Sequence, residues 1–272
     1  MNLPHAQTIP NPLLQRFGAG EVALAMMVKQ SRTVDIALAA RTCGFDAVYL
    51  DMQHNNMAPD TAAQIAALAL HAGITPLVRI PRNDYNLALR MLDGGALGII
   101  FPDITNADDA RAAVDHCKFA PVGHRSTTAI WPHFGYRSVP VGDAQRVLNA
   151  NTTVIAMIET RAGLANIEAI AGVDGLDVLH VGIGDLASDL GVPGQLHHPV
   201  VFEAMERIAA ACRAHGRIFG VGGLSGESSA GFATIVGLGA QFVTAANEWS
   251  LMISAGTERV RALRDALGKS AG

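Results

Sequence analysis

Eight short apolar runs, each followed by a stretch of helix-forming sequence, constrain the fold of this chain more than any other feature. The runs are apolar throughout rather than alternating with polar residues, which is typical of parallel strands buried on both faces. They lie at 23–28, 47–50, 75–80, 98–102, 153–159, 178–183, 218–221 and 242–245. The helical stretches lie at 34–41, 59–71, 86–92, 107–117, 164–170, 200–214, 228–236 and 248–267.

This alternation indicates an α/β protein. Eight strand–helix units in 272 residues predict a single-domain (β/α)8 TIM barrel over residues 1–272, with a doubly wound parallel sheet as the alternative. The spacing breaks once, between Pro102 and Thr153, where we expect an inserted loop at about residues 118–150. We expect that loop to form a wall of the active site, a contact between subunits or an extended loop on the protein surface. About residues 1–20 are expected to form an N-terminal arm.

Composition argues against several classes of function. A net charge of −4 without a basic cluster argues against a nucleic-acid partner. No apolar run approaches the roughly 18 residues of a membrane helix, and the first 17 residues lack the basic and apolar segments of a signal peptide. The 3 cysteines are widely spaced, which favours free thiols. We therefore expect a cytoplasmic protein that acts on small molecules.

Two carboxylates end probable strands. Glu159 closes the run that begins at Thr153, and Asp185 closes the run that begins at Asp177. Ligands of α/β proteins lie beyond the carboxyl ends of parallel strands, and carboxylate oxygens are the ligands that hard divalent cations prefer. The pair therefore predicts a site for Mg²⁺, Mn²⁺ or Co²⁺. The alternative is two acidic residues at helix N-termini on the barrel rim.

Other strand ends carry groups suited to proton transfer and anion binding. His54 follows the run 47–50 with Asp51 beside it, and a histidine there can act as a general base; the alternative is a hydrogen-bonded loop histidine. Arg79 lies within an apolar run, where a guanidinium needs a partner. It either reaches the barrel mouth to bind an enolate oxygen or forms a structural salt bridge. The glycine-rich segment 220–226 lacks the spacing of a dinucleotide-binding loop.

Five segments in this order make the chain resemble the HpcH/HpaI aldolase family of metal-dependent (class II) pyruvate aldolases. The resemblance covers about residues 14–267 and is carried by Leu50-Asp-Met-Gln-His54, Val78-Arg-Ile-Pro81, Leu92-Asp-Gly-Gly-Ala96, Ile158-Glu-Thr-Arg161 and Gly182-Ile-Gly-Asp-Leu186.

The resemblance implies a TIM-type barrel that cleaves 4-hydroxy-2-oxo acids to pyruvate, or an analogue, and an aldehyde. It implies that Glu159 and Asp185 bind the divalent metal, and that the backbone of Gly184 and Asp185 meets the substrate carboxylate. It also implies a homo-oligomer, commonly a hexamer, in which the last helix, about residues 248–267, is swapped between subunits.

The same resemblance assigns proton-transfer roles. Arg79 would hold the enolate oxygen, His54 would move protons with Asp93 as its relay partner, and Asp51 would lie near a metal-bound water. The chain departs from the family pattern at Gln53, where glutamate is usual, and at Asn55, where glycine is usual.

Two further departures lie beside the carboxylates: Met157 replaces a usual glutamine, and Ile183 replaces a usual proline. The leading hypothesis is a divalent-metal-dependent carbon–carbon lyase that acts through a pyruvate-type enolate. One alternative is a CoA-thioester lyase of the citrate-lyase type, although no basic segment for CoA is present. The other is a metabolite-binding barrel without turnover, which Gln53 and Met157 favour.

Overall fold

The strands of the barrel hydrogen-bond in chain order, and the last strand closes the ring onto the first. In this computed structural model, which describes residues 9–224 and 228–269, the eight strands are parallel. They are β1 Ala23–Val28, β2 Ala47–Asp51, β3 Thr75–Arg79, β4 Gly98–Phe101, β5 Thr153–Ile158, β6 Val178–Gly182, β7 Ile218–Gly222 and β8 Phe242–Asn247. The predicted barrel is confirmed, and the doubly wound alternative is wrong because that sheet would be open.

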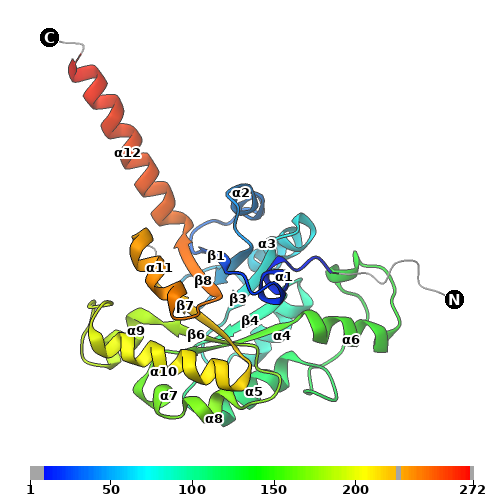
Figure 1. The fold of residues 1–272 in the computed structure, drawn as a ribbon. Coiled ribbons are helices and arrows are strands. Elements are labelled where there is room, and N and C mark those ends of the chain that lie inside the picture. Colours follow the sequence, from blue (N-terminus) through cyan, green and yellow to red (C-terminus); the bar gives the residue numbers. More distant parts are fainter. Residues whose placement is uncertain (1–8, 225–227, 270–272) are drawn as a thin grey trace.

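Helices surround the barrel between consecutive strands (Figure 1). They are α2 Ile36–Thr42, α3 Pro59–Ala72, α4 Tyr85–Asp93, α5 Ala107–Cys117, α7 Arg161–Ala165, α8 Ile167–Ala171, α10 Pro199–His215 and α11 Ser229–Gly237, and α12 Glu248–Lys269 follows the last strand. The stretch expected as one helix at 164–170 is divided into α7 and α8 at Asn166. Helix α5 begins at Asn106, whose side chain accepts hydrogen bonds from the N–H groups of Asp108 and Asp109.

The N-terminal arm contains a helix, α1 Pro12–Gly18, which packs at the N-terminal end of the barrel. Leu13 is fully buried in the interior cluster, and its N–H donates to Thr75 Oγ1 at the start of β3 (3.1 Å). Thr75 Oγ1 donates in turn to Asn11 Oδ1 (3.0 Å). This anchoring leaves the C-terminal strand ends as the place for a site.

The segment expected as an inserted loop holds a 3-10 helix, η1 Pro132–Phe134, and a helix, α6 Val141–Asn151. Its large side chains form a small core of their own: Trp131, Phe119 and Leu148 are buried together with Leu70 of α3 and Leu97. An apolar cluster of this kind gives the segment a packing role. Within the described residues, the cavity at the barrel mouth takes no lining residue from positions 118–150.

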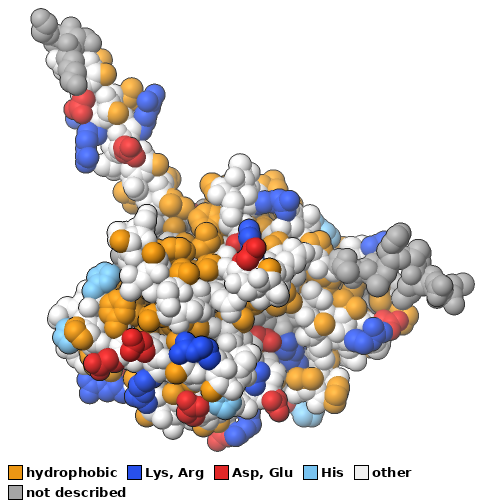
Figure 2. Space-filling model, viewed as in Figure 1, with side chains coloured by type: hydrophobic (Ala, Val, Ile, Leu, Met, Phe, Trp, Pro, Cys, Tyr) orange, Lys and Arg blue, Asp and Glu red, His pale blue; other side chains and the backbone are white. Residues whose placement is uncertain are grey.

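Two helices lie at the C-terminal side of the barrel. Helix α9, Ile183–Asp189, follows β6 directly, so Asp185 lies in its first turn rather than at a strand end. Helix α12 projects away from the barrel (Figure 1). Figure 2 shows hydrophobic side chains along this projecting helix, among them the exposed Met252, Ile253 and Val260. None of the described helices is both long and apolar enough to cross a membrane.

Candidate active site

A cavity of about 200 Å³ lies at the C-terminal ends of the strands. Strand ends and the turns after them supply its lining: Met27, Tyr49, His54, Arg79, Met157, His180, Gly182, Ile183, Gly184, Asp185, Gly222 and Gly223. The sequence-predicted residues His54, Arg79, Gly184 and Asp185 are therefore brought together. This is the position at which TIM barrels place their chemistry.

On one side of the cavity, Asp51 and Arg79 form a buried ion pair. The two residues are direct register partners on β2 and β3. Arg79 Nε and Nη2 donate to the two carboxylate oxygens of Asp51 (2.9 and 2.8 Å). Burial would raise the pKa of Asp51, but Arg79 and the N–H groups of Gln53 and His54 lower it below its ordinary value. Asp51 therefore stays ionised and fixes the guanidinium.

Arg79 forms the salt bridge of one interpretation and also lines the cavity, while its binding of an enolate oxygen stays a prediction. Its guanidinium carbon lies 5.5 Å from the centre of the Tyr49 ring, and Nη1 lies 3.8 Å from Met157 Sδ. A thioether is a weak acceptor, so Nη1 keeps most of its capacity to donate. This leaves a cationic donor available at the cavity wall.

His54 and Asp93 are not joined in this structure. The exposed His54 lines the cavity from the turn after β2. Asp93, at the end of α4, accepts a hydrogen bond from Arg125 Nη2 (2.8 Å), and the Arg125 side chain is 1% exposed. No hydrogen bond between His54 and Asp93 is found in the described residues. Their relay therefore stays a prediction.

Glu159 is buried without a full counter-charge next to Gly182, a residue that lines the cavity, but Glu159 is not itself among the lining residues. Its side chain follows β5, and Oε1 accepts the N–H of Asp103 (2.8 Å). Burial, with smaller contributions from the carboxylates of Asp103 and Asp185, raises the pKa of Glu159 to about 7 against the opposing effects of that N–H and of Arg79. Such a carboxyl is stabilised in its ionised form by a nearby cation.

The donor set fits a hard divalent cation. Asp185 is exposed toward the cavity and close enough to Glu159 to raise its pKa. A Cβ added at Gly182 would lie 2.5 Å from Glu159 Oε2, so this glycine gives that oxygen its room. Within residues 9–224 and 228–269, no cluster of three or more His, Cys, Asp or Glu residues has metal-binding geometry. Two carboxylates with waters and substrate oxygens are a usual set for Mg²⁺.

Two residues were not singled out from the sequence: Asp103, which contacts Glu159, and His180, which lines the cavity. Asp103 follows β4 and holds a left-handed backbone with φ of +53°, which aims its N–H at Glu159. His180 is buried in β6, and its Nδ1 has no hydrogen-bond partner among the described residues. Burial lowers the pKa of His180 to about 3, so its ring is neutral. A polar residue in the middle of an apolar run was the available signal for His180.

The departures from the family pattern surround the Asp51–Arg79 pair. The Gln53 side-chain oxygen is buried without a hydrogen-bond partner in the described part of the chain. Asn55 donates to the carbonyl oxygen of Asp51 and accepts the N–H of Met57 (2.7 Å), so it stabilises the turn that carries His54. Met157 Sδ lies 3.9 Å from the Tyr49 hydroxyl. The cavity thus has a less polar wall beside Arg79 than a glutamine at position 157 would give.

Comparisons with known proteins identify the family and the fold. The model of the HpcH/HpaI aldolase/citrate lyase family matches residues 24–254. The chain is 41% identical over 216 residues to a 4-hydroxy-4-methyl-2-oxoglutarate aldolase of Chaetomium globosum, covering 79% of this chain and 80% of that protein. It is 35% identical to a 5-keto-4-deoxy-D-glucarate aldolase of Salmonella paratyphi C, covering 65% and 69%. A crystal structure of an HpcH/HpaI aldolase from Desulfitobacterium hafniense superposes with a TM-score of 0.87 at 26% identity, covering 93% and 96%.

Proposed function

Because the chain belongs to the HpcH/HpaI aldolase/citrate lyase family and is a metal-dependent carbon–carbon lyase of the pyruvate-aldolase type, we propose that Glu159 and Asp185 bind the catalytic metal and that Arg79 faces the reacting 2-oxo group. The observation that supports this most directly is the raised pKa of the buried Glu159, which interacts electrostatically with both Asp185 and Arg79, two residues that line the cavity. The reaction joins or separates pyruvate, or an analogue, and an aldehyde or ketone.

When bound, Mg²⁺, Mn²⁺ or Co²⁺ supplies a Lewis acid that draws electrons from the 2-oxo group. The protein residues do the remaining work. Arg79, held by Asp51, donates a hydrogen bond to the oxygen on which negative charge develops as the C3–C4 bond breaks. His54 accepts the proton of the 4-hydroxyl group as the carbonyl product forms. The backbone of Gly184 and Asp185 at the start of α9 orients the substrate carboxylate.

The experiment that tests this proposal separates enolate formation from cleavage. Purified protein with Mn²⁺, Mg²⁺ or Co²⁺ is expected to exchange the methyl protons of pyruvate with deuterium from solvent and to release pyruvate from a panel of 4-hydroxy-2-oxo acids. EDTA should stop both reactions. Absence of both activities with all three metals would refute the proposal, whereas exchange without cleavage would retain the enolate and reject the substrate panel.

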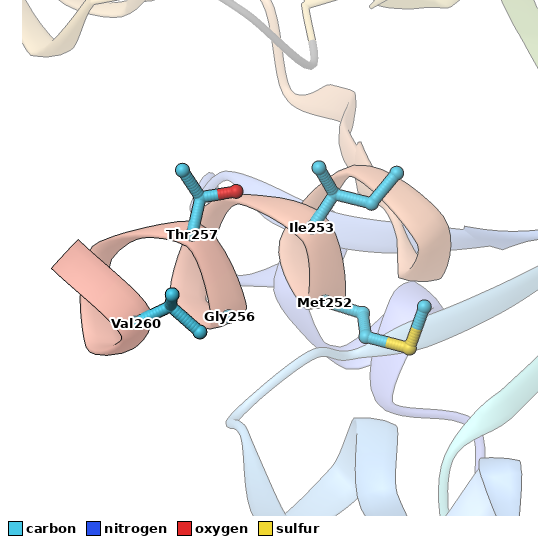
Figure 3. Close-up of a pocket in the computed structure, with 5 residues that line it drawn as sticks. All are labelled: Met252, Ile253, Gly256, Thr257 and Val260. Carbon is cyan, nitrogen blue, oxygen red and sulfur yellow. The ribbon is translucent and has the colours of Figure 1, made fainter. Parts of the chain in front are cut away.

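We further propose that the protein is a homo-oligomer in which α12 lies against another copy of the chain, as expected for a hexamer with a swapped last helix. Figure 3 shows Met252 and Val260 on one side of α12 and Ile253 on another. These three residues, with Gly256 and Thr257, line a surface cavity of about 400 Å³. A projecting helix with apolar groups on several sides is stabilised by association. Light scattering should show an oligomer, and Ile253→Lys should reduce its mass.

A further inference from the structure

A lysine just after β1 lies beside the Asp51–Arg79 pair and has no part in the proposed chemistry. Met27 of β1 lines the cavity, and Lys29 comes two residues later, just past Val28, where the strand ends. Lys29 Nζ lies 3.9 Å from Asp51 Oδ2, and its side chain is 35% exposed. Lys29 is not among the lining residues, but its ammonium lies next to the carboxylate that holds Arg79 at the cavity wall.

Lys29 is not required to neutralise Asp51. Arg79 already donates to both oxygens of that carboxylate. The Lys29 ammonium is too far from Asp51 for a hydrogen bond, and it makes no hydrogen bond to another side chain or carbonyl in the described residues. An ammonium group carries three donors. Beside Arg79, whose Nε and Nη2 donate to Asp51, Lys29 thus supplies a second available positive charge.

The backbone of Lys29 is held by an acid from the last unit of the barrel. Glu248 begins α12, and its Oε1 accepts the N–H groups of Lys29, Gln30 and Ser31 (2.7, 2.5 and 3.0 Å). Three successive N–H groups that converge on one oxygen fix a turn. The loop that carries Lys29 is therefore preorganised, so that less conformational entropy is lost when its ammonium binds an anion.

We propose that Lys29 is a specificity-determining residue that binds a second carboxylate of the substrate, on the part that leaves as the carbonyl product. This inference rests on the proposed function, in which the metal side and Arg79 take the 2-oxo acid part. The acceptor class is then a 2-oxo acid rather than a neutral aldehyde, because a charge-assisted hydrogen bond to Lys29 compensates for desolvating the second carboxylate.

Binding of two unreactive ligands tests the proposal. 2-Oxoglutarate has the 2-oxo acid part and a distal carboxylate, and 2-oxopentanoate lacks the distal carboxylate. Calorimetry on the full-length protein with Mn²⁺ should show about 10- to 100-fold tighter binding of 2-oxoglutarate. Lys29→Met should remove most of that preference, while Lys29→Arg should retain part of it. Arg82→Met, which removes an exposed cation that follows β3, is the matched control and should keep the preference.

The outcomes separate this proposal from the proposed function. If 2-oxopentanoate binds but 2-oxoglutarate binds no more tightly, or if the preference survives in Lys29→Met, the role of Lys29 is refuted and the aldolase site stands. If Lys29→Met also stops pyruvate proton exchange, Lys29 acts on the enolate instead and the specificity role is refuted. If neither ligand binds with metal, the metal site fails and the Lys29 proposal fails with it.

Discussion

Buried charge is paired with an opposite charge on one side of the barrel mouth and lacks a full counter-charge on the other. On the side of β2 and β3, Asp51 and Arg79 neutralise each other through two hydrogen bonds. On the side of β5 and β6, Glu159 is 4% exposed, yet the groups that add to the effect of burial on its pKa are two further carboxylates, Asp103 and Asp185. Arg79 offsets them only in part.

This difference separates a preorganised part of the site from a part that awaits a ligand. A paired charge is stable without further partners, so the Asp51–Arg79 side can hold its geometry before substrate arrives. Like charges at close range raise each other's pKa until a cation or a proton arrives. Metal and pH are therefore expected to change the stability of the protein through the side of β5 and β6. Substitution is expected to change it through the side of β2 and β3.

The largest expected effect follows from removing a metal ligand. Glu159→Gln keeps the size of the side chain and its hydrogen bond from Asp103 but loses the negative charge. We expect kcat for cleavage to fall by about a thousandfold or more, because the cation that stabilises the enolate is lost. A pyruvate-release assay at saturating Mn²⁺ measures this effect. Glu168→Gln, at an exposed site on α8, is the control. Near-normal turnover of the Glu159 variant would show that the metal lies elsewhere.

Breaking the paired side should affect folding as well as catalysis. Arg79→Met leaves Asp51 buried without its guanidinium, and stranding one partner of a buried pair costs about 3 to 4 kcal/mol. Urea denaturation at neutral pH measures the loss in the free energy of unfolding. Asp51→Asn combined with Arg79→Met should recover part of it. If Arg79→Met alone were as stable as the original protein, Asp51 and Arg79 would not be electrostatically coupled.

Because of Glu159, the free energy of unfolding of the metal-free protein should fall as the pH rises. The pKa of Glu159 is raised from 4.5 to about 7, so the stability that its protonated form contributes is fully present below about pH 4.5 and is lost as the pH rises through about 7. Glutamine cannot ionise. Relative to the original protein in EDTA, Glu159→Gln should therefore gain about 3 kcal/mol of unfolding free energy between pH 4.5 and pH 8. A difference independent of pH would contradict the raised pKa.

The smallest of these effects is stabilisation by metal. A cation at about 100 times its Kd should add about 2.7 kcal/mol to the free energy of unfolding, provided that it binds the folded state alone. Thermal denaturation with and without Mn²⁺ measures this as a rise in Tm. The rise should vanish in Glu159→Gln and persist in Lys29→Met, whose substitution lies on the paired side. An equal rise in all three proteins would indicate binding at another site.

The strands were predictable because their runs are almost wholly apolar, as burial on both faces requires. The helices that were missed had weaker signals. Ile183, the first residue of α9, continues the apolar run of β6, so the strand seemed to extend to residue 183. In α6, a proline and a glycine lie at the start, and the buried face is small, with Ala144 and Leu148 as its buried residues.

Of the site, the sequence indicated the residues at strand ends but not their partners. Glu159, Arg79 and Asp185 could be named because each interrupts or ends an apolar run. The pairing of Asp51 with Arg79 depends on the register between β2 and β3, and that register is not determined by either strand alone. Asp103 acts through its backbone N–H, which leaves no signature in the residue type. Lys29 resembles a surface lysine until β1 and β2 are placed side by side.

The left-handed backbone of Asp103 has a practical consequence for protein engineering. Because the N–H of that residue contacts Glu159, its side chain can be exchanged without loss of this hydrogen bond. Glycine adopts a φ of +53° at little cost, so Asp103→Gly would keep the hydrogen bond while removing one of the carboxylates that disfavour ionisation of Glu159. A substitution at position 103 should thus change how strongly protons compete with metal for Glu159. It leaves unaltered both of the carboxylates assigned to hold the ion.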